Sequence, residues 1–272
     1  MILLSFFGYR WLAGSTLFAL HRVRVSGAST TLSAEIEQKA RRFIGQTSVA
    51  NLDLSALKQE VEKSIPRVQT AWVRRVLPDE LRIEVSERRP AVLVRRENGN
   101  LMWLDGEGIE LGDINSIKTS GSAALPPVAR GFSEGNPTPG SAAEDRERIV
   151  IYRQIEKEFS QDPEPVLGKV DEIDLKFTKD VNLRIARTVV MVHVGSRDFR
   201  NRFETGLAVL EAATRGNEDM LRRYKVPDAG NVTRNAGRIN YIEAARSDRV
   251  VLSFSSPAAE KKEREKQETK KR

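Results

Sequence analysis

The sequence contains no cysteine and two histidines, and 6% of its residues are aromatic. Without cysteine the chain can form no disulfide, thiolate metal site or cysteine nucleophile. His21 and His193 stand far apart, each within a predicted strand, so we interpret them as surface or core residues rather than ligands. The scarcity of these side chains removes the most common routes to metal and nucleophilic chemistry.

Motifs of catalysis and nucleotide binding are also missing. Gly106 and Gly108 lack the third glycine of a dinucleotide loop, and the sequence holds neither a P-loop nor a nucleophile elbow. The acidic residues Asp105, Glu107 and Glu110 do not have the spacing of an EF-hand and fit a β-turn instead. We therefore predict no enzymatic activity, cofactor, metal or small-molecule substrate.

The chain carries a net charge of +7 and has a pI near 9.7, yet it has no concentrated basic region. Arginine pairs such as Arg41-Arg42 and Arg74-Arg75 fall in different predicted elements. Dispersed arginines are typical of a solvated surface, so we predict no nucleic-acid partner.

Residues 1–17 form an apolar run with Arg10 as its single charge, and we interpret it as a transmembrane segment rather than a buried helix. The run is shorter than the roughly 20 residues that cross a bilayer, and it lacks a preceding basic leader. A cleaved signal peptide fits poorly for the same reason. We expect the natural helix to begin upstream, although Arg22 and Arg24, taken literally, place the body of the protein in the cytoplasm.

Residues 18–89 show a β-α-α-β-β pattern. A strand over residues 18–26 precedes one helix, capped by Ser33, with Ile36, Ala40 and Phe43 on its apolar stripe. Asp53 caps a second helix. Two strands follow, residues 68–76 and 81–87, joined by a turn at Pro78-Asp79. We expect two helices on one face of a three-stranded sheet.

The last two strands alternate apolar and polar residues, which assigns their faces. Apolar positions such as Leu81, Ile83 and Val85 point to the helices. The outer face then carries Trp72, Arg74, Arg82 and Glu84. A tryptophan there is either covered by a neighbouring loop, the interpretation we favour, or part of a binding face.

Residues 90–256 are richer in short strands, which we predict at 91–96, 101–104, 108–111, 170–177, 181–186, 189–194, 238–243 and 249–254. Residues 125–128 resemble a short edge segment, helices are predicted at 143–159 and from Asp198, and residues 217–238 are polar and partly loop. The charged tail, residues 257–272, is predicted to be disordered. The fold class is α+β, with a larger, mostly antiparallel β domain and flanking helices after the first domain.

Several motifs resemble the FtsQ/DivIB family of bacterial cell-division proteins. The resemblance is carried by Val23-Arg-Val25-Ser-Gly27, Leu52-Asp-Leu54, the run from Ile65-Pro66 to Pro90-Ala91, Leu104-Asp105 with Gly108, and Tyr241-Ile242-Glu243. It implies a single-pass inner-membrane protein with a membrane-proximal POTRA domain and a distal β domain in the periplasm. It also implies a divisome scaffold at the septum, with FtsK on the POTRA side and the FtsB–FtsL pair on the β domain.

The last strand offers a physical mechanism for such binding, because an exposed sheet edge accepts a partner strand through main-chain hydrogen bonds. We predict that a segment of FtsB pairs there, with the protein-binding residues Lys179, Tyr241, Arg246, Arg249, Val250, Val251, Leu252 and Phe254. Tyr241 and Phe254 would anchor the partner. Alternatively, Val250 and Leu252 only fill the core, and residues 243–246 depart from the usual family pattern.

A second function remains open at this stage. The alternative is a periplasmic assembly or chaperone module that captures extended peptides on its POTRA sheet. Localisation separates the two, since a division protein gathers at midcell.

Overall fold

The computed structural model describes residues 19–44, 49–117, 125–135, 138–160, 166–246 and 249–255. The chain divides into two compact units: the first extends to Pro90 and also takes in Ile109–Leu111, and the second comprises the remainder from Ala91. The predicted membrane segment, residues 1–17, and the predicted disordered tail, residues 257–272, lie outside the described residues. Among the described residues, no helix combines the length and the apolar character that a membrane crossing requires.

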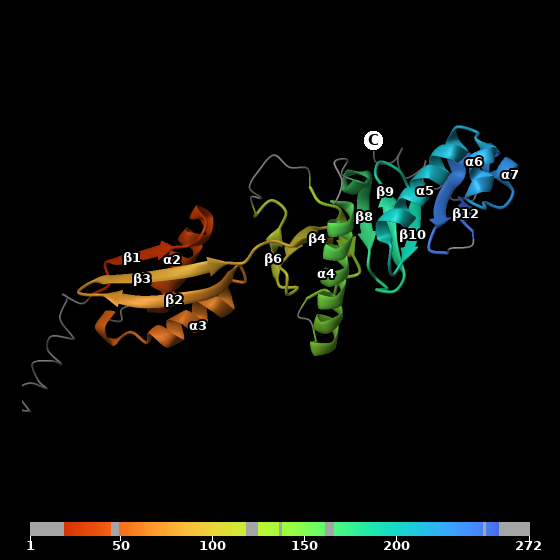
Figure 1. Ribbon diagram of the computed structural model, residues 1–272. Coiled ribbons are helices and arrows are strands. Elements are labelled where there is room, and N and C mark those ends of the chain that lie inside the picture. Colours follow the sequence, from red (N-terminus) through yellow and green to blue (C-terminus); the bar gives the residue numbers. More distant parts are fainter. Residues whose placement is uncertain are drawn as a thin grey trace, which may run out of the picture. The chain divides into compact units, whose positions relative to one another are not determined.

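The first unit has the predicted order of two helices inserted between the first strand and a hairpin (Figure 1). Its elements are β1 (Arg22–Ser26), α2 (Thr30–Ile44), the 3₁₀ turn η2 (Val49–Asn51), α3 (Leu54–Ser64), β2 (Val68–Val76) and β3 (Glu80–Glu87). The strands are ordered β1-β3-β2, with β1 parallel and β2 antiparallel to β3. The central strand is therefore the one whose alternation was strongest in the sequence.

The helix starts were predicted with mixed success. Asp53 caps α3 as expected, because its carboxylate accepts hydrogen bonds from the backbone N–H groups of Ser55 (2.9 Å) and Ala56 (3.0 Å). The prediction that Ser33 caps α2 is wrong, since this helix already begins at Thr30. Phe43 was also wrongly placed on the apolar stripe: it is exposed, and Ile44 is buried in its stead.

The core of the first unit lies between the sheet and the helices. Ala71, Leu81, Ile83 and Val85 are buried, as predicted from alternation. They pack against apolar residues of α2 and α3, namely Leu32, Ile36, Ala40, Leu57 and Val61. Both described helices of this unit therefore lie on one face of its sheet.

The second unit is built on a nine-stranded sheet, whose end strand, Glu110–Asp113, begins within the segment Ile109–Leu111 that groups with the first unit. Its elements are β4 (Val92–Arg95), β5 (Leu101–Leu104), β6 (Glu110–Asp113), β7 (Val128–Arg130), α4 (Pro139–Phe159), η3 (Val166–Lys169), β8 (Val170–Asp174), β9 (Val181–Ile185), β10 (Met191–Gly195), α5 (Phe199–Thr214), α6 (Glu218–Arg223), α7 (Ala229–Arg234), η4 (Ala236–Arg238), β11 (Ile239–Glu243) and β12 (Val251–Phe254). The strand order is β12-β11-β10-β9-β8-β7-β4-β5-β6. This larger β domain and the smaller first unit confirm the predicted α+β class.

The position of β7 differs from the prediction. Residues 125–128 were expected at an edge, but β7 lies inside the sheet, parallel to both β4 and β8. Proline has no N–H to donate to the hydrogen bonds between strands. Because Pro126 and Pro127 precede β7, every residue of the strand itself keeps its backbone N–H. The phenol of Tyr152 donates to the carbonyl of Pro127 (3.0 Å) and so holds the segment that leads into β7 against α4.

The helices α4 and α5 lie on the same side of the sheet (Figure 1). Their buried residues include Tyr152, Phe159 and Phe203, which join strand residues such as Val192 in one core. Gly206 allows this close packing, because a Cβ atom there would lie 2.6 Å from Cγ1 of Val192. The short helices α6 and α7 occupy much of the polar region 217–238, which was expected to be partly loop.

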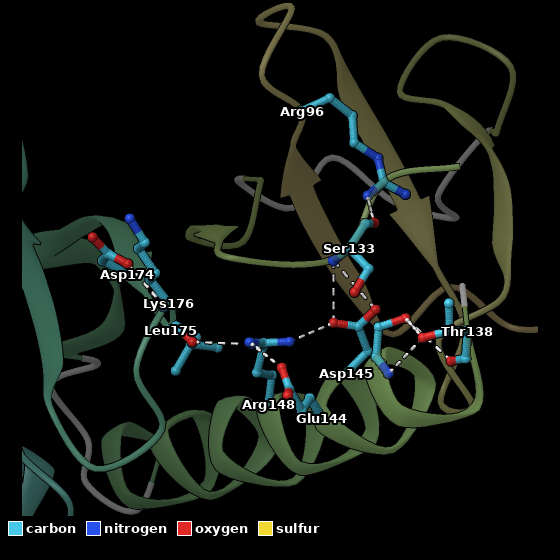
Figure 2. A network of polar contacts seen from close by, with 10 residues as sticks. Arg96, Ser133, Thr138, Glu144, Asp145, Arg148, Asp174, Leu175 and Lys176 are labelled. Carbon is cyan, nitrogen blue, oxygen red and sulfur yellow. Dashed lines mark hydrogen bonds and ion pairs between the residues drawn. The ribbon is translucent and has the colours of Figure 1, made fainter. Parts of the chain in front are cut away.

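A polar network around the buried Asp145 and Arg148 fixes the N-terminal part of α4 (Figure 2). Arg148 donates from Nε to the carbonyl of Leu175 (3.1 Å), from Nη1 to Asp145 (2.8 Å) and from Nη2 to Glu144 (3.0 Å). The carboxylate of Asp145 also accepts from the backbone N–H of Ser133 (3.2 Å). Because Ser133 follows β7 and Leu175 follows β8, the network ties the helix to the ends of both strands.

Candidate functional site

The strand β12 ends the nine-stranded sheet, and among the described residues β11 is its one strand neighbour. The two strands are antiparallel, with Glu243 opposite Val251, Ile242 opposite Leu252 and Tyr241 opposite Ser253. Within the described part of the chain no further strand lies beyond β12, so it presents an edge at the end of the sheet. The prediction that the last strand occupies an edge is confirmed.

The backbone direction at this edge follows from one hydrogen bond. The N–H of Ser255 donates to the carbonyl of Arg238 (2.8 Å), and therefore points toward the β11 side. The register shift falls on β11, between Ile239 and Tyr241, which leaves β12 regular. Since alternate residues of an antiparallel strand point their N–H and C=O groups to opposite sides, Leu252 and Phe254 direct theirs to the outer edge.

The side chains of β12 divide between the two faces of the sheet. Leu252 and Phe254 are half-buried and pack against the core of the second unit, which also contains the buried Val250. Val251 is half-buried and Ser253 exposed on the opposite face. The side chains of Val250 and Leu252 therefore contribute to the core, as the alternative interpretation predicted. The backbone N–H of Leu252 nevertheless points to the outer edge of β12.

Basic residues stand near this edge. Arg246 and Arg249 are exposed in the loop between β11 and β12. Lys179 is also exposed, but it lies in the turn before β9, and β10 and β11 separate that strand from β12. The fold thus brings the two arginines to the edge and leaves the lysine beyond two intervening strands.

A cluster around His193 lies beside the edge, and sequence reasoning missed it. Nδ1 of His193 is 2.7 Å from Oε2 of Glu243, and Nε2 is 2.9 Å from Oδ1 of Asp180. Each ring nitrogen thus lies at hydrogen-bonding distance from a carboxylate. The second oxygen of Glu243 accepts from the backbone N–H of Ala245 (3.1 Å), so the cluster orients the loop that leads to β12.

Tyr241 belongs to the same cluster. Its ring stacks on that of His193, with centroids 6.4 Å apart and an interplanar angle of 18°. Burial and, after it, the negative charges of Glu243 and Asp180 raise the pKa of Tyr241 to about 12. The phenol is therefore neutral at physiological pH and keeps its O–H as a donor beside the edge. Alternation in β10 and β11 could have indicated the shared face, but not the pairing of these two strands.

The comparisons with known proteins agree with this architecture. A family model described as "POTRA domain, FtsQ-type" matches residues 18–88, which include the first unit's elements from β1 to β3. Proteins named "Cell division protein FtsQ" from Koribacter versatilis and Geotalea daltonii are 31% and 29% identical over 152 and 201 residues. Residues 18–88 form a POTRA domain of the FtsQ type, and the chain is similar to cell-division proteins named FtsQ.

The matched region covers 55% of this chain and 41% of the Koribacter protein, and 72% of this chain and 68% of the Geotalea protein. For the relative of the same name from Streptomyces venezuelae, 25% identical, it covers 65% of each chain. The chain thus spans less than half of the first of these FtsQ relatives. Below, the first unit is called the POTRA domain and the second the β domain.

The POTRA residues predicted for the outer face lie together there. Trp72 and Arg74 of β2 stand opposite Glu84 and Arg82 of β3. The favoured interpretation of Trp72, that a loop covers it, is wrong, since 54% of this residue is exposed. Within the described parts of this FtsQ-type chain, no group of acidic and histidine side chains has the arrangement of a metal site.

Proposed function

We propose that this chain is a non-enzymatic scaffold of the bacterial divisome, essential for cell division. It is anchored in the inner membrane by one helix, with the POTRA and β domains on the periplasmic side at the septum. The POTRA domain meets the early protein FtsK, and the β domain meets the FtsB–FtsL pair. Similarity to cell-division proteins named FtsQ supports this role, as does the strand edge that β12 presents among the described residues.

We propose that a segment of FtsB adds to β12 as a further strand. The observation that carries this proposal is the direction of the edge amides: Leu252 and Phe254 point their N–H and C=O groups away from β11. An extended peptide satisfies these groups through main-chain hydrogen bonds. Side chains on both faces of the sheet, among them Val251, Tyr241 and Phe254, then contact the added strand and determine its register.

Electrostatic attraction favours an acidic partner segment. Arg246 and Arg249 are exposed in the loop that enters β12, and exposed charges of this kind raise association rates more than affinity. Lys179, further along the sheet, extends the same positive character. We therefore expect acidic residues in the FtsB segment that approaches this loop.

The function is tested by imaging a fluorescent fusion of the chain in its host and by depleting the native protein. The proposal predicts midcell fluorescence and filamentous cells on depletion. In a parallel binding assay, Arg249→Glu and Phe254→Ala should each weaken FtsB retention, since one removes the attraction and the other an anchor. Uniform envelope fluorescence with normal division would contradict the proposal.

The alternative, a module that captures extended peptides on the POTRA sheet, has less support. The edges of that sheet are β1 and β2, and at β2 the backbone N–H of Ala71 already donates to the carboxylate of Glu62 (2.8 Å). Arg75 also reaches back from β2 to the carbonyl of Val49 (2.8 Å). An incoming strand would have to displace Glu62 from this edge, whereas β12 has no such side chain across its amides among the described residues.

A further inference from the structure

The outer face of the POTRA sheet carries three arginines side by side. Arg82 of β3 stands directly opposite Arg24 of β1 on one side and Arg74 of β2 on the other. Like charges in directly opposite positions destabilise a sheet. A row of three across all the strands of this sheet is therefore unfavourable unless anions compensate its charge.

Carboxylates of the same face neutralise this row in part. Glu80 accepts from Nε of Arg82 (2.6 Å) and lies 3.5 Å from Nε of Arg24. Arg74 is exposed and forms no ion pair within the described residues, and the same holds for Glu84. A shallow depression is lined by Arg24, Val25, Ser26, Arg74, Arg82 and Glu84, which is three positive charges against one negative.

An exposed tryptophan adjoins the arginine row. Trp72 stands opposite Glu84, next to the row on the same face, and 54% of it is exposed. Tryptophan and arginine together are typical of surfaces that meet lipid headgroups, because the indole is amphipathic and the guanidinium binds phosphate. The sheet face is also open, so it can approach a plane.

The chain itself limits how far this face lies from the apolar run of residues 1–17. Arg22, which begins β1, comes five positions after residue 17, and five extended residues reach at most about 17 Å. If residues 1–17 lie in a bilayer, as the proposed function requires, β1 is held close to the headgroups. Phosphates are then the anions at highest local concentration around Arg24.

We propose that this face, defined by Arg24, Arg74, Arg82 and Trp72, docks on anionic phospholipids of the bilayer that anchors the chain. Lipid phosphates accept hydrogen bonds from the arginine row, and Trp72 sits at headgroup level. The proposal rests on the proposed membrane anchoring. Docking would hold the POTRA domain against the membrane surface and leave its helical side for protein partners.

The absence of cysteine allows a direct test with the full chain. Ser26→Cys places a single environment-sensitive nitrobenzoxadiazole label on the face, next to the arginines. The control, Gln59→Cys, labels an exposed position of α3 on the helical side. Each protein is reconstituted in nanodiscs of phosphatidylcholine alone or of equal parts phosphatidylcholine and phosphatidylglycerol.

We expect a blue shift and brighter emission from the label at position 26 in the anionic discs, reversed by high salt, with no change from the label at position 59. Arg74→Glu should abolish the shift, whereas Arg42→Glu, the same charge change on α2, should preserve it. Trp72→Ala should reduce it. Unchanged circular dichroism confirms that each variant is folded.

Two outcomes overturn the proposal: equal emission from the label at position 26 in both discs, or a response that appears only when an acidic peptide is added. The second would assign the face to a protein partner. Failure of the membrane anchoring is distinguishable, since the chain would then not copurify with the discs at all. Retention of FtsB by the Arg74→Glu variant separates this face from the proposed β12 site.

Discussion

Glu80 shows how a single carboxylate supports a surface crowded with arginines. It is buried beneath Arg22, Arg24 and Arg82, and it accepts a 2.6 Å hydrogen bond from Nε of Arg82. That hydrogen bond, with added attraction from the other two arginines, holds the pKa of Glu80 below its ordinary value of 4.5. Arg82 and Arg24 are thereby tolerated in opposite positions.

The lowered pKa of Glu80 makes POTRA stability depend on pH. A carboxylate whose pKa is lower in the folded state stabilises the fold above its unfolded pKa, and this contribution is lost as pH falls through the folded pKa. Glu80→Gln should therefore lower the unfolding free energy at pH 7, and the difference from the native chain should shrink below about pH 4.5. Hydrogen exchange of β3 peptides, measured by mass spectrometry at several pH values, checks this.

Glu84→Gln is the matched control for that measurement. Glu84 lies on the same strand and face but forms no ion pair within the described residues. Its substitution should leave β3 protection nearly unchanged across the same pH range. A loss of protection in Glu80→Gln that persists undiminished to acidic pH would assign the role of Glu80 to packing rather than charge.

At the scale of elements, the hydrogen-bond donors on the outer side of β12 can be removed without removing those that bind β11. Leu252 directs its N–H to the outer edge, so Leu252→Pro removes an edge donor without taking a hydrogen bond from β11. Leu252→Ala truncates the same side chain but keeps the donor. We expect Leu252→Pro to bind FtsB–FtsL about tenfold more weakly than Leu252→Ala, since one hydrogen bond is lost and the ring obstructs strand addition.

Surface plasmon resonance with the purified full chain measures this pair of affinities. Hydrogen exchange of β11 serves as the folding control, because both variants should protect it equally. Equal affinities for the two variants would show that the partner does not use the main chain of β12.

The elements that the sequence predicted are those whose signals are local. In the hairpin β2–β3, Leu81, Ile83 and Val85 alternate with polar residues, and the fold places them as expected. Asp53 likewise caps α3 through its own neighbours. The caps of α6 and α7 are equally local, since Asn217 and Asp228 accept from N–H groups three residues onward. These helices went unpredicted because six residues are too few to show a periodicity.

Long-range pairing is what the sequence did not reveal. The three residues of β7 lie between β4 and β8 through parallel pairings that no local pattern encodes. The same is true of the candidate site, where His193 meets Glu243 because β10 and β11 pair in parallel. The edge position of β12 was predictable because it is the last strand in the sequence. The direction of its amides could be assigned only from the register between β11 and β12.

At the scale of the whole molecule, the POTRA and β domains have separate hydrophobic cores. Leu81 is fully buried in one and Leu183 in the other, and no buried residue is shared between the two clusters among the described residues. A Leu→Ala change in a core costs about 2–5 kcal/mol. For a domain of roughly 70 residues that is a large part of the total stability.

Leu81→Ala should therefore unfold or nearly unfold the POTRA domain while β11 and β12 keep their hydrogen-exchange protection and FtsB–FtsL binding. Leu183→Ala should do the reverse: it should weaken the β domain and partner binding and leave β3 protected. Exchange measured on the full-length variants, together with the binding assay, tests both halves. Loss of β11 protection in Leu81→Ala would show that the two domains unfold as one cooperative unit, and the partner binding proposed for one domain could then not be independent of the other.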